Sequence, residues 1–382
     1  IGVQVDAIGR GEDRTQFKQT MAELDIEVPR SEAVYSVEDA ERVAEGLGYP
    51  CVVRPAYTMG GTGGGLVYNV DELRTVAARG IQASRIGQIL VEESILGWEE
   101  LELEVVRDSK NQMITVCFIE NIDPVGVHTG DSFCSAPFLT VDEELQDRLQ
   151  EDAYRIAEGI QVIGGTNVQF AHDPETGRVV VIEINPRTSR SSALASKATG
   201  FPIALVSAKL AGGMTLDEIP YWREGTLEKY TPSGDYVVVK FSRWAFEKFQ
   251  DVEDKLGTQM RAVGEVMSLG KTYKEAFLKA IRSLEIGRYG LGFADDFNDL
   301  ELDEILPRLN EPSSQRQFLL YEALRKGASI EQLRQKTYIN PWFLEQMQEL
   351  VELEEEVRSH EPDEVPDELF IRAKKDGFSD RY

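Results

Sequence analysis

The stretch Thr166–Pro186, "TNVQFAHDPETGRVVVIEINP", constrains the fold more than any other part of the chain. Two runs rich in β-branched and aromatic residues flank a turn at 173–177, so the stretch predicts a β-hairpin. Helical patterns and further apolar runs precede it. A chain that alternates helices with strands and contains such a hairpin is expected to be α+β, with a mixed or antiparallel sheet.

Capping patterns and apolar runs predict the other elements of this part of the chain. A serine, threonine or asparagine followed three residues later by an acid favours a helix start, because the first side chain accepts a backbone N–H. The expected helices are 12–24, those opened by Ser36, Asn69 and Thr140 (the last to about Ile160), and 192–210; the expected strands are 49–56, 88–95, 101–108 and 113–121.

From about Leu300 onward the patterns are helical only. Ser329 with Gln332 forms a capping box, and Asn340 before Pro341 is typical of a helix start. The sequence therefore predicts a small all-helical domain after the α+β part. We expect its apolar positions to favour self-association or docking to other parts of a longer protein; they are Leu344, Met347, Leu350, Val351 and Leu353.

Length and charge exclude several classes of partner. The 382 residues predict two or three domains. A formal net charge of −26 argues against nucleic acid and anionic membranes as partners. Three cysteines, an odd number, argue against a disulfide framework and favour a reducing cytoplasm. The chain begins without Met, which we expect of a processed chain or a piece of a longer protein.

Four polar side chains are expected on one face of the hairpin. Asn167 and Gln169 on the first arm, and Glu183 and Asn185 on the second, are each two residues apart, and such residues share a strand face. Carboxylate and amide oxygens are ligands that Mg²⁺ accepts, with phosphate oxygens and water. Because two arginines follow at 187 and 190, the pattern favours a metal–phosphate site over a merely solvated strand face.

The glycine-rich run 60–65 is neither a P-loop nor a dinucleotide fingerprint, because a strand is expected after it. Its backbone N–H groups suit a loop that closes over phosphates, and a plain tight hairpin is the alternative. Arg54 ends a strand just before this run, where it either pairs with phosphate or is an exposed strand-end residue. Taken singly, four further residues are typical of surface or structural positions: Arg14, Glu93, Glu100 and His128.

Five stretches together resemble the large chain of carbamoyl phosphate synthetase. They are "PCVVRPAYTMGGTGGG", "EESILGWEELELEVVRD", "IENIDPVGVHTGDS", "GGTNVQFAHDPETGRVVVIEINPRTSRSSALASKATGFPIA" and "KFQDVEDKLGTQMRAVGEVMSLGKT". The resemblance covers nearly the whole chain and implies an ATP-grasp fold. It implies the first, carboxyphosphate-forming half of that large chain, followed by part of its helical oligomerisation domain.

The resemblance also implies which residues form the site. It places bicarbonate at Arg187 and Arg190, beside Asn185 and Glu183, and Mg²⁺ or Mn²⁺, as two ions, at Gln169, Glu183 and Asn185. It places ATP phosphates at Arg14, Arg54, Gly60 and Gly61, and the adenosine end at Glu93 and Ile95. It places the ribose at Glu100, the rest of the nucleotide pocket at Gly126, Val127 and His128, and K⁺ near Glu100, Asn121 and Ser132.

The same resemblance implies partners and boundaries. The expected partners are ATP, bicarbonate, a glutamine amidotransferase small chain, the remaining half of the large chain and an oligomer, in the pyrimidine and arginine pathways. The expected boundaries are 1–10 for the remnant of a preceding lobe, 11–290 for the ATP-grasp domain and 291–382 for the helical domain. Two alternatives remain, namely another ATP-grasp carboxylase or ligase and an inactive scaffold fragment.

Overall fold

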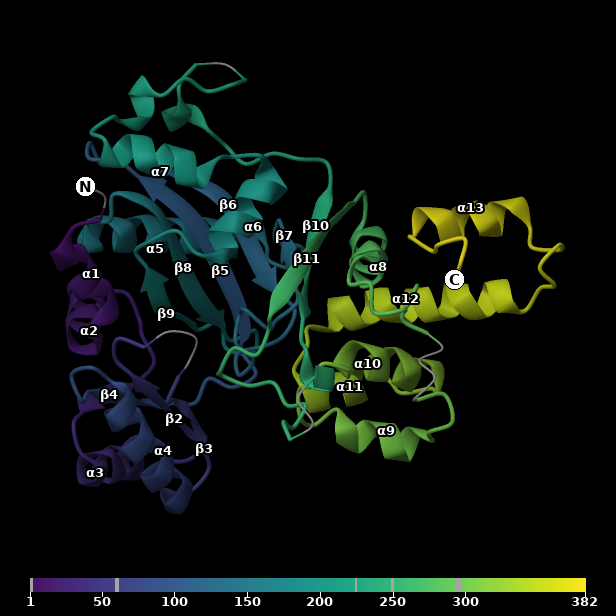
Figure 1. The fold of residues 1–382 in the computed structure, drawn as a ribbon, viewed down its shortest axis with the longest axis horizontal. Helices are drawn as coiled ribbons and strands as arrows, with labels where there is room; N and C mark the ends of the chain where they lie inside the picture. Colours follow the sequence, from purple (N-terminus) through teal and green to yellow (C-terminus); the bar gives the residue numbers. More distant parts are fainter. Residues whose placement is uncertain (1–2, 59–61, 224, 249–250, 293–296) are drawn as a thin grey trace. The chain divides into compact units, whose positions relative to one another are not determined.

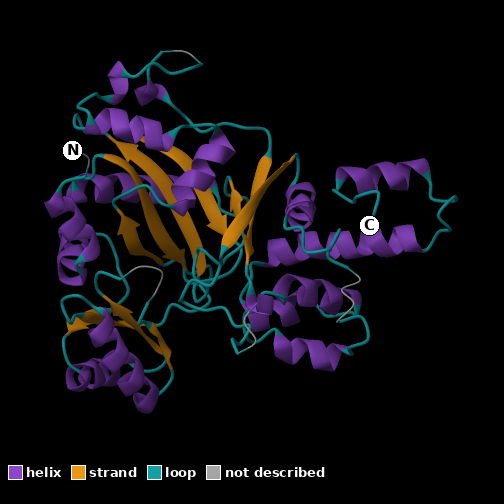
Figure 2. Ribbon diagram, in the orientation of Figure 1, coloured by secondary structure: helices purple, strands orange, loops and turns teal. Residues whose placement is uncertain are grey.

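The computed structural model describes residues 3–58, 62–223, 225–248, 251–292 and 297–382, and the chain divides into two compact units (Figure 1). Unit 1 comprises Ile1–Glu120 and Ala136–Gly234, and unit 2 comprises Asn121–Ser135 and Asp235–Tyr382. Helices combine with antiparallel strands (Figure 2), which confirms the α+β prediction. No helix of the described residues is both long and apolar enough to cross a membrane. The boundaries at 10/11 and 290/291 stay a prediction.

A small four-stranded antiparallel sheet forms the first layer of unit 1. Its strand order is β1 (Ser31–Val34), β4 (Ile89–Glu93), β2 (Cys51–Pro55) and β3 (Gly65–Val67). Helices α3 (Val37–Leu47) and α4 (Val70–Ala83) pack against it, and their apolar faces join the strands in one core. Ser36 and Asn69 cap these helices as predicted, because each side chain accepts backbone N–H groups of the first turn.

A second set of paired strands in unit 1, part of a seven-stranded sheet, carries the predicted hairpin. Its strand order is β6 (Met113–Asn121), β5 (Glu99–Arg107), β8 (Gly164–His172) and β9 (Val179–Asn185). One face is apolar and is covered by α1 (Val5–Glu12), α2 (Arg14–Glu23) and α5 (Glu143–Ile160). Arg10 donates to the Ile160 carbonyl at 2.8 Å and so satisfies the C-terminal end of α5.

Three predicted helices of unit 1 differ in detail. The helix expected at 12–24 is broken at Asp13, whose carboxylate accepts the N–H groups of Thr15 and Gln16 and starts α2. The cap of α5 is Asp142 and not Thr140, whose hydroxyl donates to Glu120. The segment 192–210 forms two helices, α6 (Arg190–Thr199) and α7 (Ile203–Ala211), because Gly200 adopts a positive φ before Pro202.

Unit 2 combines three strands with helices. Strand β10 (Val237–Arg243) pairs with β11 (Gly264–Gly270) and lies next to β7 (Cys134–Ala136). The sequence patterns did not predict β10 and β11. The remaining helices are α8 (Tyr273–Ser283), α9 (Leu302–Arg308), α10 (Arg316–Arg325), α11 (Ile330–Thr337), α12 (Pro341–Arg358) and α13 (Asp367–Lys375). Short 3₁₀ helices occur at Leu216–Glu218 and Leu227–Lys229 in unit 1 and at Phe246–Lys248 in unit 2.

The helical end of unit 2 confirms the caps and corrects one prediction. Ser329 forms its capping box with Gln332, and Asn340 caps α12. The apolar side chains of α12 were expected to form an association surface. They are buried among the chain's own helices instead, because α10, α11 and α13 pack around α12; the five positions are Leu344, Met347, Leu350, Val351 and Leu353.

Candidate functional site

The hairpin register places the polar residues in two rows across unit 1. Gln169 lies opposite Glu183, and Asn167 lies opposite Asn185, so the four residues share one face of the hairpin as expected. Strand β5 extends both rows, because Glu102 pairs with Gln169 and Glu104 pairs with Asn167. This face is the one opposite the apolar core, since residues of opposite parity, such as Leu101 and Val168, belong to that core.

Arg54 reaches the hairpin from the end of β2. Its Nη2 donates to Glu183 Oε2 at 2.7 Å, and its Nη1 donates to Glu92 Oε1 at 3.4 Å. The side chain is 19% exposed, so the alternative of an exposed strand-end arginine is wrong. Burial works against the charged guanidinium, but the carboxylates of Glu92 and Glu183 outweigh it and raise the pKa of Arg54.

Arg14, at the start of α2, shares this environment. Burial, and then the positive charge of Arg54, lowers the pKa of Arg14. Its Nε is buried and has no hydrogen-bond partner among the described residues. An arginine side chain stays protonated at such a place and needs an acceptor. Two neighbouring guanidinium groups with an orphaned donor therefore fit a polyanion such as a nucleotide phosphate.

Asn185 connects the hairpin to the arginines that follow it. Its Nδ2 donates to Glu183 Oε1 at 3.2 Å, and its Oδ1 accepts from Arg187 Nη2 at 3.0 Å. Arg187 is exposed, and Arg190, also exposed, is the first residue of α6. The end of β9 therefore joins an acid, an amide and a guanidinium through direct contacts.

The oxygen atoms at this place fit a divalent cation of the hard type. No group of three or more His, Cys, Asp and Glu with metal-binding geometry occurs in the described ranges. The expected set differs in kind, since it combines one carboxylate, Glu183, with the amides of Gln169 and Asn185, and it leaves the other positions to phosphate and water. Glu183 contacts Arg54 and Asn185 here, so a bound cation would replace part of this pairing.

The sequence reading missed two buried acids in the same rows, Glu102 and Glu104. They are 3% and 0% exposed. Asn167 Nδ2 donates to Glu102 Oε2 at 3.0 Å and to Glu104 Oε1 at 3.1 Å, and Ser192 Oγ donates to Glu104 Oε2 at 2.7 Å. The available signal was the repeat "ELELE", in which acids at every second position share one strand face.

We expect Glu104 to make the stability of the chain depend on pH. Burial raises the pKa of this carboxyl from 4.5 to about 7, against the opposing effect of its hydroxyl partners. The unfolded chain loses this proton at lower pH than the folded chain, so the contribution to stability falls as pH rises from 4.5 to about 7. Compared with Glu104→Gln, the wild type should lose about 3 kcal/mol over this window.

Urea unfolding of both proteins at pH 5 and pH 8 measures this difference. The comparison cancels the other titrating groups, which the two proteins share. A difference in the free energy of unfolding that stays constant between the two pH values would contradict the expectation.

Other expected site residues lie in unit 1 with their side chains in use. Both oxygens of Glu93 are occupied, by the Arg30 backbone N–H at 2.8 Å and Nε at 2.7 Å, and by Arg178 Nη2 at 2.8 Å. The roles of Glu93 and Ile95 at an adenosine stay predictions. Glu100 is buried on β5.

The glycine run is only partly described. Gly60 and Gly61 lie outside the described residues. Gly63 has a φ of 81°, and a Cβ there would lie 2.6 Å from Ala83 Cβ, so close packing against α4 requires a glycine. Packing thus explains part of the glycine run independently of phosphate binding.

The remaining expected residues lie in unit 2, on the segment 121–135. His128 Nδ1 accepts the Gly130 N–H at 2.9 Å, which is a turn-stabilising role. Asp131 accepts from the Trp244 indole at 3.0 Å and from two backbone N–H groups, and thereby holds the segment to its own unit. The nucleotide roles of Gly126, Val127 and His128, and K⁺ at Asn121 and Ser132, stay predictions.

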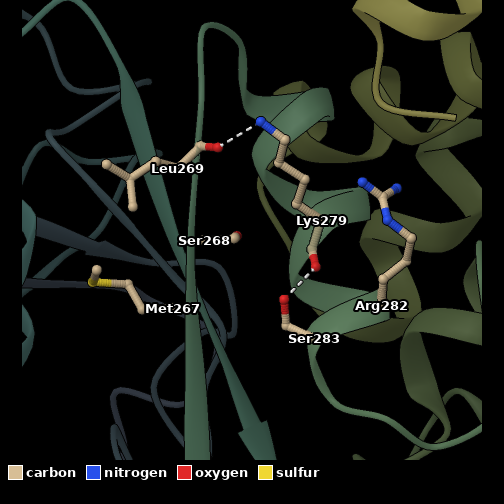
Figure 3. Close-up of a pocket in the computed structure, with 6 residues that line it drawn as sticks. All are labelled: Met267, Ser268, Leu269, Lys279, Arg282 and Ser283. Atoms are coloured by element: carbon tan, nitrogen blue, oxygen red, sulfur yellow. Dashed lines mark hydrogen bonds between the residues drawn. The ribbon is translucent and has the colours of Figure 1, made fainter. Parts of the chain in front are cut away.

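A separate cavity of about 450 Å³ lies between β11 and α8 of unit 2 (Figure 3). The two basic side chains that line it, Lys279 and Arg282, are hydrogen-bonded to other groups of the chain. Lys279 Nζ donates to the Leu269 carbonyl at 3.1 Å and to Glu275 at 2.6 Å, and Arg282 donates to the Gly377 carbonyl. This cavity therefore does not compete with the hairpin face as a binding site for an anion.

Comparisons with known proteins identify the family of the chain. Residues 13–219 match the family described as carbamoyl-phosphate synthase L chain, ATP binding domain. The chain belongs to this family. Residues 265–382 match the oligomerisation domain of the carbamoyl-phosphate synthetase large chain.

Two relatives show how much of a carbamoyl phosphate synthase large chain is present. The large chain of Archaeoglobus fulgidus is 50% identical over 387 residues, which cover 100% of this chain and 36% of that protein. The large chain, N-terminal section, of Methanopyrus kandleri is 47% identical over 393 residues, which cover 100% of this chain and 70% of that protein. The chain thus spans little more than a third of the length of the A. fulgidus protein.

Solved structures show that this chain shares the ATP-grasp fold. A biotin carboxylase–β,γ-ATP complex from Campylobacter jejuni has a TM-score of 0.58 at 16% identity and covers 87% of this chain and 76% of its own. The biotin carboxylase domain of 2-oxoglutarate carboxylase from Hydrogenobacter thermophilus, in complex with MgADP and bicarbonate, has a TM-score of 0.59 at 17% identity, covering 74% and 67%. At these identities the likeness concerns the fold.

Proposed function

We propose that the chain uses ATP to activate bicarbonate as carboxyphosphate, the first step of carbamoyl phosphate synthesis in the pyrimidine and arginine pathways. The observation that carries the proposal is the polar face of the hairpin, where Glu183 contacts Arg54 and is linked through Asn185 to Arg187. Membership of the synthase family supports it. So does the fold shared with a carboxylase domain solved with MgADP and bicarbonate.

In the proposed reaction an oxygen of bicarbonate attacks the γ-phosphorus of ATP. The bond from that phosphorus to the β,γ-bridging oxygen breaks, ADP leaves with its electron pair, and carboxyphosphate keeps the bicarbonate proton. Both reactants are anions, so the chain must neutralise charge and align the attacking oxygen. Arg14 and Arg54 take the phosphates, and Arg187 with Arg190 takes the bicarbonate. Glu93 and Ile95 would bind the adenosine.

Gln169, Glu183 and Asn185 would hold Mg²⁺ or Mn²⁺. When bound, a divalent cation there supplies positive charge to the phosphate oxygens. K⁺ would bind near Glu100, next to the proposed nucleotide site.

The proposed partners follow from membership of the family. We infer that it acts in the cytoplasm with a glutamine amidotransferase small chain and the remaining half of the large chain, in an oligomer. Carboxyphosphate hydrolyses readily, so a further part must consume it near this site.

The decisive experiment measures ADP release by the purified chain with Mg-ATP, with and without bicarbonate. We expect bicarbonate to stimulate release, and we expect amino acids and biotin to have no such effect. A parallel assay with radiolabelled bicarbonate and ammonia traps carbamoyl phosphate, and we expect none from the chain by itself. Release that is indifferent to bicarbonate would contradict the proposal, and carbamoyl phosphate formed as fast as ADP would contradict the division of labour between the two halves.

A further inference from the structure

Glu104 connects two parts of the site through one buried carboxylate. One oxygen accepts from Asn167 on β8 at 3.1 Å, and the other accepts from Ser192 in the first turn of α6 at 2.7 Å. The side chain is 0% exposed, so no water competes for these bonds. The hairpin and the helix are thereby held to the same strand, β5.

The first connection leads to Arg187. Both N–H groups of the Asn167 amide are taken, by Glu104 and by Glu102. This fixes the rotation of the amide, because its nitrogen must face the two acids and its Oδ1 then faces Asn185 Nδ2 at 3.4 Å. Asn185 in turn presents Oδ1 to Arg187 at 3.0 Å.

The second connection leads to Arg190. Ser192 Oγ donates to Glu104 and accepts the Ser189 N–H at 3.0 Å, so it belongs to the capping box of α6. Arg190 is the first residue of that helix. A shift of Ser192 therefore moves the helix start that carries Arg190.

A charged carboxylate at this buried place lowers the stability of the fold. Burial opposes its charge and raises its pKa. A glutamine of the same size would fill the space without that penalty. A buried acid whose charge lowers stability is typical of a functional site.

We propose that Glu104 is a positioning residue that sets the places of Arg187 and Arg190, acting through Asn167 and Ser192. The inference rests on the proposed role of the two arginines at bicarbonate. It predicts that loss of Glu104 weakens the use of bicarbonate and leaves the grip of Arg14 and Arg54 on ATP unchanged, since the contacts described for those arginines do not include Glu104.

The test compares Glu104→Leu, Glu104→Gln and Ser192→Ala in the full chain, with Glu120→Gln as matched control. Glu120 is also a buried acid of this sheet, but it lies on the opposite face and accepts from the Leu139 and Thr140 N–H groups at 2.7 and 3.1 Å. Glu104→Leu should raise the KM for bicarbonate roughly tenfold, as expected for a lost charge-assisted hydrogen bond, and change the KM for ATP less than about twofold. Glu104→Gln keeps one carbonyl acceptor and should restore most of the loss, and Glu120→Gln should leave both KM values at the wild-type level.

Crystal structures of the variants provide a readout that does not depend on activity. In Glu104→Leu we expect the Asn167 amide to rotate and the contact between Arg187 and Asn185 to break, while Arg54 stays on Glu183. An unchanged KM for bicarbonate in folded Glu104→Leu, or an intact contact between Arg187 and Asn185, would overturn the inference. If that variant does not fold, Ser192→Ala with wild-type KM overturns it. A wild-type chain that ignores bicarbonate contradicts the proposed function instead, and the crystal structures still decide the role of Glu104.

Discussion

Replacing Glu183 with glutamine lowers bicarbonate-dependent turnover of Mg-ATP by about 100-fold or more, the scale of losing one electrostatic group that acts in the transition state. The change removes a negative charge and keeps the size of the side chain. Two effects add in the same direction. The proposed cation loses its only charged protein ligand, and Arg54 loses the partner that lies 2.7 Å away. The fold should survive, because Glu183 is 29% exposed and lies near the end of β9.

The measurement is ADP release at saturating Mg-ATP and bicarbonate, with the fold checked by circular dichroism. Glu92→Gln is the control, because Glu92 contacts the same Arg54, at 3.4 Å, but lies on β4 and not on the hairpin. Its effect should stay below about tenfold, since it disturbs one hydrogen bond to Arg54 and no cation ligand. Near-wild-type turnover in folded Glu183→Gln would refute the metal assignment.

Replacing Arg316 with alanine destabilises unit 2 by about 3–5 kcal/mol, the usual effect of breaking a buried ion pair. Arg316 is 2% exposed and donates to Asp123, which is 0% exposed. Burial raises the pKa of Asp123 even with Arg316 beside it, so an unpaired carboxylate there is strongly disfavoured. Asp123 also accepts the Phe133 N–H at 3.1 Å, so the change should loosen the segment that carries His128.

Urea unfolding followed by tryptophan fluorescence measures this loss. Arg42→Ala is the control, because its ion pair with Glu32 is exposed and should change the unfolding midpoint little. The double variant Asp123→Leu, Arg316→Met should recover part of the stability, since it removes both charges together. Equal midpoints for Arg316→Ala and Arg42→Ala would show that the buried pair is not needed.

Local interactions explain why much of the fold was predictable. The caps at Ser36, Asn69 and Ser329 involve side chains and backbone groups within three residues, so the sequence contains both partners. The hairpin itself was predictable for the same reason, because its turn is local. The pairing of Gln169 with Glu183 was not, because it depends on a register shift between Gln169 and Phe170 that the local pattern does not contain.

Competing partners for the same side chains explain why two helix starts were predicted wrongly. Asp142, two residues after Thr140, is the better cap because Thr140 is drawn to Glu120, twenty residues earlier in the chain. Asp13 breaks the expected first helix in a similar way. In α12 the apolar positions were expected to favour self-association or docking, and only the packing of the neighbouring helices shows that the chain itself covers them.

By itself, the sequence determined the α+β class, the hairpin, the acid and amides on its polar face, and the resemblance to the synthase family, because each depends on residues near one another in the chain or on a specific motif. The tertiary structure decided which distant residues share that face. It brought Arg54 onto Glu183, 129 residues away, and joined Ser192 to Glu104, 88 residues away. The physical reason is burial: a carboxylate or guanidinium removed from water must find a partner, and only the packing of the sheets determines which groups are within reach.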